Sequence, residues 1–154
     1  MSVGLAWAVE RPAEVDPARL EHAARAALER GGRGDDPIDV VVLGDAALAE
    51  LHDRFLGDPS PTDVLAFDLG PGGDGPAGEV YVSLDTARRV AQRRGLALER
   101  ELALYVIHGC LHLCGFDDHE ARERERMRRA EAELLAELGY PEDPAPHDEE
   151  PVGG

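Results

Sequence analysis

A largely apolar stretch at residues 98–114, which carries two histidines after a charged first turn, constrains the fold more than any other part of the chain. Its length is typical of a helix rather than a strand, and Gly115 is a natural residue to end that helix. Imidazoles buried among Leu, Val and Ile side chains need partners, because an unpaired buried polar group is costly. The stretch therefore predicts a buried helix that carries a polar site.

The two histidines, His108 and His112, are four residues apart. In a helix this spacing leaves the second side chain about 40° from the first and one turn along, so both imidazoles can reach one ion. Asp117, Asp118 and His119 follow Gly115 directly and can fold back toward the same ion. Three protein ligands and one open position are typical of a catalytic zinc site. We therefore predict one divalent metal ion, with zinc as the first choice and nickel, copper or iron as alternatives.

Residues close to the two histidines limit the kind of metal site that this helix can form. Cys110 and Cys114 each lie about 200° around the helix from a histidine, so we expect buried free thiols and no closed Cys/His zinc site. A zinc peptidase of the HExxH type has its general base directly after the first histidine, where this chain has Gly109. The sequence therefore argues against that mechanism. Glu101, seven residues before His108, lies on the same helix face and is a candidate for supporting the site.

Composition and charge limit the possible partners. The net charge is −16, and residues 141–154 contain five acidic residues and no basic one. Such a charge opposes broad attraction to nucleic acid but allows local basic patches. We expect residues 1–140 to form a single domain and residues 141–154 to be a disordered acidic tail. The absence of a long apolar run and of a basic N-terminal region predicts no membrane span, no signal peptide and a cytoplasmic location.

Periodicity and turn residues predict an α+β fold, a small mixed sheet of about four strands packed with about five helices. An Asp-Pro pair predicts a helix start at Asp16, and Gly31 ends that helix. In the helix that begins at Asp45, we expect Leu48, Leu51 and Phe55 to face inward. The expected strands are residues 3–9, 38–43, 64–67 and 79–83, and the expected helices are 16–31, 45–55, 85–94, 98–114 and 120–138.

Several segments, in the same order, resemble the YbeY family of metal-dependent endoribonucleases. The segment from His108 to Asp117, with the pattern His-Gly-x-Leu-His-Leu-x-Gly-Phe-Asp, resembles the family signature. Residues 61–67 (Pro-Thr-Asp-Val-Leu-Ala-Phe) and residues 78–83 (Gly-Glu-Val-Tyr-Val-Ser) resemble a family loop and strand. The resemblance covers roughly residues 36–138.

The resemblance implies a three-histidine zinc site and cleavage of single-stranded RNA in ribosomal RNA maturation and quality control. The implied partners are precursor ribosomal RNA or the small ribosomal subunit, together with ribosome-associated proteins, and neither DNA nor a membrane. The family has its third histidine where this chain has Asp118, and His119 is one residue further on. Either residue is an acceptable zinc ligand, and we slightly favour His119 because the turn is flexible.

A second departure concerns phosphate binding. The family usually has an arginine at the position of Leu56. Arg54, Arg88 and Arg89 are possible substitutes, and each is equally compatible with an ordinary solvated helix surface. Beyond the metal and its water, no catalytic residue is assigned, although Arg54, Asp63 and Glu101 are candidates for support. Thr62 and Asp63 are expected to line the cleft or to be simple turn residues.

Two other functions remain open at this point. One is a metal-dependent hydrolase of another ester or amide. The other is a ribosome-assembly factor that acts through protein contacts and holds a largely structural metal, which the acidic composition and Leu56 favour.

Overall fold

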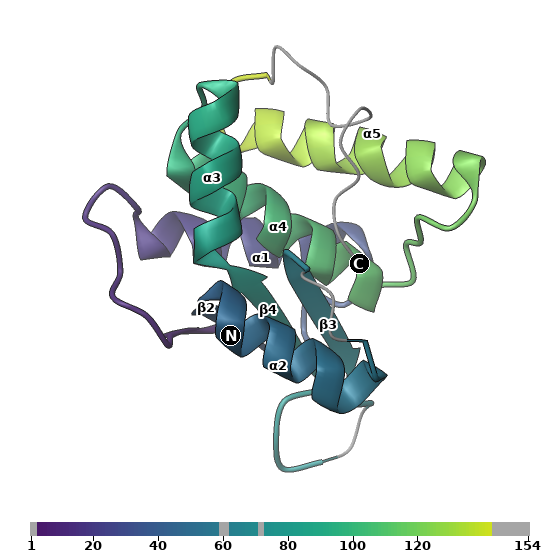
Figure 1. Cartoon of the computed structure of the whole chain (residues 1–154). Helices are drawn as coiled ribbons and strands as arrows, with labels where there is room; N and C mark the ends of the chain where they lie inside the picture. Colours follow the sequence, from purple (N-terminus) through teal and green to yellow (C-terminus); the bar gives the residue numbers. More distant parts are fainter. Residues whose placement is uncertain (1–2, 59–61, 71–72, 143–154) are drawn as a thin grey trace.

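The computed structural model describes residues 3–58, 62–70 and 73–142. They form a four-stranded mixed sheet with five helices (Figure 1). The strands are β1 (Val3–Trp7), β2 (Ile38–Leu43), β3 (Val64–Asp68) and β4 (Gly78–Ser83). The helices are α1 (Pro17–Arg30), α2 (Asp45–Leu56), α3 (Leu84–Arg94), α4 (Leu98–Leu113) and α5 (Ala121–Glu137). The predicted α+β class is confirmed, and the predicted element boundaries are close to those observed.

The sheet has the strand order β1-β2-β4-β3. The first three strands are parallel, and β3 pairs antiparallel with β4 at the edge. Helices α1 and α4 pack on one face and α2 packs on the other, while α3 and α5 also contact α4 (Figure 1). The site helix α4 is thus covered by the sheet and by three other helices, which explains why all of its residues except His112 are buried.

Alternating side chains of the strands supply the two sides of the sheet. Val40, Val80 and Val82 are almost fully buried in the main core, together with residues of α1 and α4. A smaller cluster on the other face contains Leu43, Leu48 and Leu65 under α2. The site helix therefore lies on the larger and better packed side of the sheet.

The expectation that Phe55 of α2 faces inward is wrong, because this side chain is 59% exposed. Phe55 comes seven residues after Leu48, at nearly the same helix angle, but two turns further along. Its ring contacts Phe67 edge-on near the end of β3, with 5.7 Å between centroids. The small cluster ends at this point, and the ring also has the Arg54 guanidinium over it, 6.0 Å from its centroid.

Both ends of α1 agree with their sequence signals, since Asp16 is its N-cap and Gly31 its C-cap. Asp16 caps α1 by accepting a hydrogen bond from the Ala18 amide, with Pro17 directly after it.

None of the helices in the described ranges is both long and apolar enough to cross a bilayer. The predicted disordered tail lies outside the described residues from position 143 onward.

Candidate metal centre

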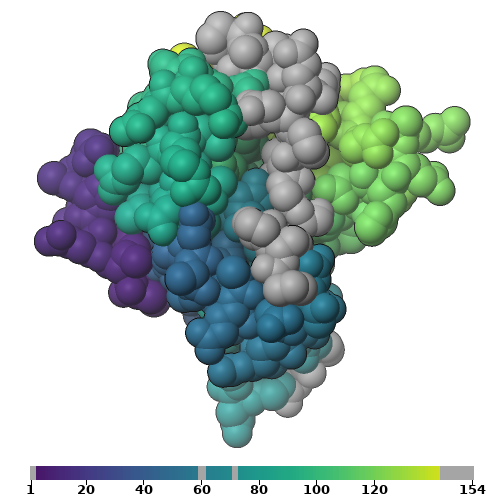
Figure 2. Space-filling model, in the orientation of Figure 1, coloured from purple at the N-terminus to yellow at the C-terminus, as the bar shows by residue number. Residues whose placement is uncertain are grey.

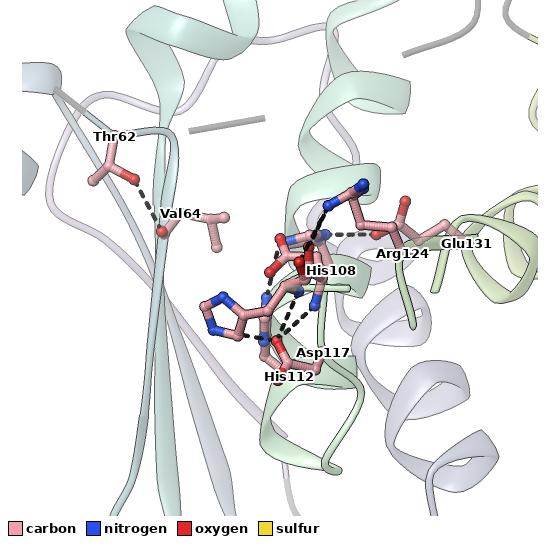
Figure 3. Close-up of polar contacts among 9 residues, drawn as sticks. Thr62, Val64, His108, His112, Asp117, Arg124 and Glu131 are labelled. Carbon is pink, nitrogen blue, oxygen red and sulfur yellow. Dashed lines mark hydrogen bonds and ion pairs between the residues drawn. The ribbon is translucent and has the colours of Figure 1, made fainter. Parts of the chain in front are cut away.

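Helix α4 places His108 and His112 side by side, as their spacing predicts. The ring centroids are 4.7 Å apart, and the rings meet edge-on (Figure 3). His108 is buried with 7% of its surface exposed, whereas His112 is only partly buried. The pair therefore lies where the apolar helix reaches the surface, with one imidazole inside and the other accessible.

A carboxylate from α5 orients the inner imidazole. Nδ1 of His108 is 2.6 Å from an oxygen of Glu131, which is itself buried. This bond leaves Nε2 of His108 to face outward, the arrangement by which carboxylates hold metal-binding histidines. Glu131 was not predicted from the sequence, although one signal was present: it interrupts the buried stripe formed by Met127, Ala130 and Leu134 on α5.

The turn after α4 brings a second carboxylate to the two histidines. Gly115 has φ +93°, a conformation that side-chain-bearing residues rarely adopt, and it reverses the chain. An oxygen of the Asp118 carboxylate then lies 3.8 Å from Nε2 of His108 and 3.8 Å from Nε2 of His112. The structure thus brings together His108, His112 and Asp118.

His119 occupies a different position. Its side chain is 82% exposed and its Nε2 lies 3.3 Å from a carboxylate oxygen of Asp117. That same Asp117 oxygen accepts hydrogen bonds from the backbone amides of Asp118 and His119, at 2.7 and 3.2 Å. Among the described residues His119 therefore belongs to a second group, with Asp117 and Asp118, and not to the group formed with the two α4 histidines.

Burial and charge act differently on the two imidazoles. Burial alone would lower the pKa of His108, but the hydrogen bond and negative charge of Glu131 outweigh it, so the pKa is raised. Burial and the neighbouring His108 lower the pKa of His112, which keeps this imidazole neutral at pH 7. The site combines one neutral imidazole, one carboxylate-bound imidazole and the Asp118 carboxylate.

These donors fit a divalent metal ion. The ligand atoms of His108, His112 and Asp118 all lie within 4.8 Å of one another. Zinc bonds of about 2.0–2.2 Å in a tetrahedron place ligand atoms roughly 3.3–3.6 Å apart, so only a small contraction from 3.8 Å is required. Two nitrogen donors and one oxygen donor are a normal catalytic zinc set with one position left open.

Close packing explains the glycine between the histidines. A Cβ atom at Gly109 would lie 2.5 Å from Cγ1 of Val80 and 3.1 Å from Cγ2 of Val64. The helix backbone therefore rests directly on β3 and β4, and a glutamate at this position has no room. The general base of the zinc peptidases is excluded here by packing, which agrees with the sequence argument.

The cysteines agree with their predicted role. Both are free, and Cys110 is fully buried. Cys114 is half-buried and lies against the end of α1, close to Gly31. Neither thiol belongs to a potential metal group within the described ranges.

Two predicted supporting carboxylates are buried near α4. Asp63 is 5% exposed, and its negative charge contributes to the raised pKa of His108, which places it close to the site. Glu101 is fully buried, 3.6 Å from Nη1 of Arg100, and it raises the pKa of Tyr105 after the larger effect of burial. Thr62 is buried, and its hydroxyl donates to the Val64 carbonyl at 3.3 Å, which is turn chemistry (Figure 3).

Two of the three arginines suggested as substitutes for Leu56 form ion pairs elsewhere, and the third, Arg88, is exposed on α3. Arg54 is exposed and pairs with Glu50 at 3.4 Å on its own helix. Arg89 pairs with Asp45 at 2.7 Å and joins α3 to α2. Leu56 itself is 59% exposed at the end of α2.

The chain is similar in sequence to known proteins. A family model described as Endoribonuclease YbeY matches residues 9–139. The Endoribonuclease YbeY of Anaeromyxobacter sp. (strain Fw109-5) is 42% identical over 123 residues, which cover 79% of this chain and 64%, slightly less than two thirds, of that relative. That of Thermus thermophilus is 38% identical over 77% of this chain and 88% of its own length, and that of Rhodopseudomonas palustris is 34% identical over 92% and 88%.

The fold is also found among solved structures. The solution structure of a Thermotoga maritima protein superposes with a TM-score of 0.55 over 88% of this chain and 90% of that one, at 24% identity. This likeness concerns the fold alone. The family model and the curated relatives together show that the chain belongs to the YbeY endoribonuclease family.

Proposed function

We propose that this chain is a metal-dependent endoribonuclease that cleaves single-stranded RNA during ribosomal RNA maturation and quality control in the cytoplasm. The substrate is precursor ribosomal RNA, free or on the small ribosomal subunit. One divalent ion, with zinc as the first choice, is held by His108, His112 and Asp118. Family membership supports the reaction class, and the geometry of these three residues supports the metal.

One observation carries the proposal. Two imidazole Nε2 atoms face a single carboxylate at 3.8 Å each, while Glu131 holds the opposite nitrogen of His108 at 2.6 Å. A buried histidine with no metal to bind needs only one such partner. Here Nδ1 is already satisfied, and Nε2 is aimed at the shared point. This aim is what a metal ligand requires.

When bound, the divalent ion supplies a Lewis acid for a phosphoryl oxygen and for water. The residues of the chain provide the surroundings. Glu131 fixes the tautomer and orientation of His108, and burial keeps His112 neutral and able to bind. Asp63, which is buried and whose negative charge helps to raise the pKa of His108, is the carboxylate we propose as cleft-lining support. Arg54 and Glu101 have weaker support for such a role, because one pairs with Glu50 at the surface and the other lies beside Arg100 in the interior.

A role in ribosome assembly through protein contacts is a second candidate. Phe55 and Leu56 are each 59% exposed at the end of α2, and Leu56 replaces the arginine that is usual in the family. An exposed apolar pair of this kind suits a protein partner better than an RNA backbone. In that case the metal would serve mainly to hold the turn. Hydrolysis of another ester or amide is the remaining alternative.

Cleavage of a single-stranded ribosomal RNA precursor by the purified protein tests the proposal. We expect the wild-type protein to cleave it and His112→Ala to be inactive, with chelation abolishing and zinc restoring wild-type activity. Equal cleavage by both proteins would contradict a metal nuclease. Activity on small esters with none on RNA would favour the other hydrolase.

The third ligand has its own test. Asp118→Asn and His119→Asn remove one candidate each and leave the size of the side chain similar. Zinc content after dialysis should fall in Asp118→Asn and stay near one equivalent in His119→Asn. The opposite pattern would show that the turn rearranges so that His119 binds.

A further inference from the structure

Basic residues gather on one helix beside the candidate metal centre. All sixteen basic residues of the chain are arginines, and five of them lie within residues 121–129, where only two glutamates accompany them. This is the first half of α5, which lies at the molecular surface (Figure 2). In a chain with a net charge of −16, such a segment is a local site of attraction for phosphates.

Arg124 joins this segment to the site. Its Nη1 lies 3.3 Å from the carbonyl oxygen of Asp118 and 3.3 Å from that of His119 (Figure 3). The guanidinium is therefore next to the turn whose carboxylate faces the two α4 histidines. A guanidinium carries five N–H donors, so one nitrogen can hold the turn while the others bind a phosphate.

Arg128 extends this surface along the helix. It lies four residues after Arg124, hence on the same side of α5. Both line an open groove whose other walls are Ala121, Glu125 and Arg129. Arg129 forms an ion pair with Glu125 at 2.9 Å, so that charge is partly compensated. Two guanidinium groups one helix turn apart, the first of them beside the turn of the metal centre, suit two phosphates of an extended strand.

We infer that Arg124 and Arg128 form the RNA-backbone-binding surface of this chain. They would take over the function of the arginine that the family usually has at the position of Leu56. The inference rests on the proposed function, because it assigns the substrate contacts of that same site. Arg124 is chosen because it contacts the turn of the site, whereas Arg54 and Arg89 lie on α2 and α3, where they pair with Glu50 and Asp45. Single-stranded RNA would follow α5 with one phosphodiester bond beside His112.

Fluorescence anisotropy of a labelled single-stranded RNA, read before detectable cleavage, tests this surface. Arg124→Gln and Arg128→Gln should each weaken binding several-fold and reduce the slope of log K against log salt by about 0.7. Arg122→Gln is the matched control, because it removes the same charge from the same helix but lies about 200° around the axis from Arg124. We expect it to bind like the wild-type protein.

The outcomes separate the inference from the proposed function. If the wild-type protein cleaves RNA but both groove variants bind like Arg122→Gln, the inference is wrong and the nuclease proposal stands. If the wild-type protein neither binds nor cleaves RNA, both fail. Zinc content and thermal unfolding show whether Arg124→Gln has disturbed the turn. If the turn is disturbed, Arg128→Gln tests the inference instead, because Arg128 lies further from the turn. A wild-type salt slope in that variant would overturn the inference.

Discussion

Replacement of Gly109 by alanine is the sharpest test of how α4 is positioned. The new Cβ would lie 2.5 Å from Cγ1 and 3.3 Å from Cγ2 of Val80, and 3.1 Å from Cγ2 of Val64. Carbon atoms in contact normally keep about 3.5–4.0 Å. Val80 is fully buried in β4, between two neighbouring strands, so it cannot move aside. The helix itself must therefore shift away from the sheet.

Two effects of opposite sign set the magnitude. Overpacking of a tight core costs about 1–3 kcal/mol, and the clash of nearly 1 Å with an immobile strand puts this case at the upper end. Alanine is more favourable than glycine inside a helix by about 1 kcal/mol. We expect the overpacking to dominate, with a net loss of about 2 kcal/mol in the free energy of unfolding.

Urea denaturation of the metal-free proteins measures this loss. Gly75→Ala is a suitable control, since a Cβ there meets nothing within 4 Å. Val80→Ala removes the methyl groups that clash, so the double variant should be at least about 1 kcal/mol more stable than the sum of the single effects predicts. A Gly109→Ala protein as stable as wild type, or strictly additive effects, would refute the argument from close packing.

Two further predictions concern Glu131 and Asp45. Glu131→Gln removes the charge that holds His108 and should weaken zinc affinity about 10- to 100-fold in a chelator competition. Glu133→Gln, at an exposed position on the same helix, is the control and should bind zinc like the wild-type protein. Equal zinc affinities of the two variants would contradict the orienting role of Glu131. Burial alone would raise the pKa of Asp45, but the hydrogen bond from Ser83 and further bonds from α3 lower it below its usual value. The ionised Asp45 carboxylate thus contributes its full stabilisation of the folded state above about pH 4. This stabilisation is lost as the pH falls through the lower pKa that Asp45 has in the folded protein. The deficit in unfolding free energy of Asp45→Asn should shrink from pH 7 to pH 3, and a constant deficit would contradict this.

The local pattern of residues determined much of this protein. The spacing of His108 and His112 in an apolar run predicted a buried helix with two imidazoles on one side, because helix geometry depends only on sequence separation. Asp16 with Pro17 located the start of α1 for the same local reason.

Contacts between distant segments were decided by the tertiary structure. Whether Asp118 or His119 faces the histidines depends on how the turn after Gly115 is held, and a residue on the next helix, Arg124, helps to hold it. Glu131 reaches His108 across 23 residues, through the packing of α5 on α4. The periodicity of a sequence predicts which side of a helix is buried. It does not predict which two buried side chains of different elements are in contact. That pairing follows from the docking of whole elements, and here it determines the candidate metal centre.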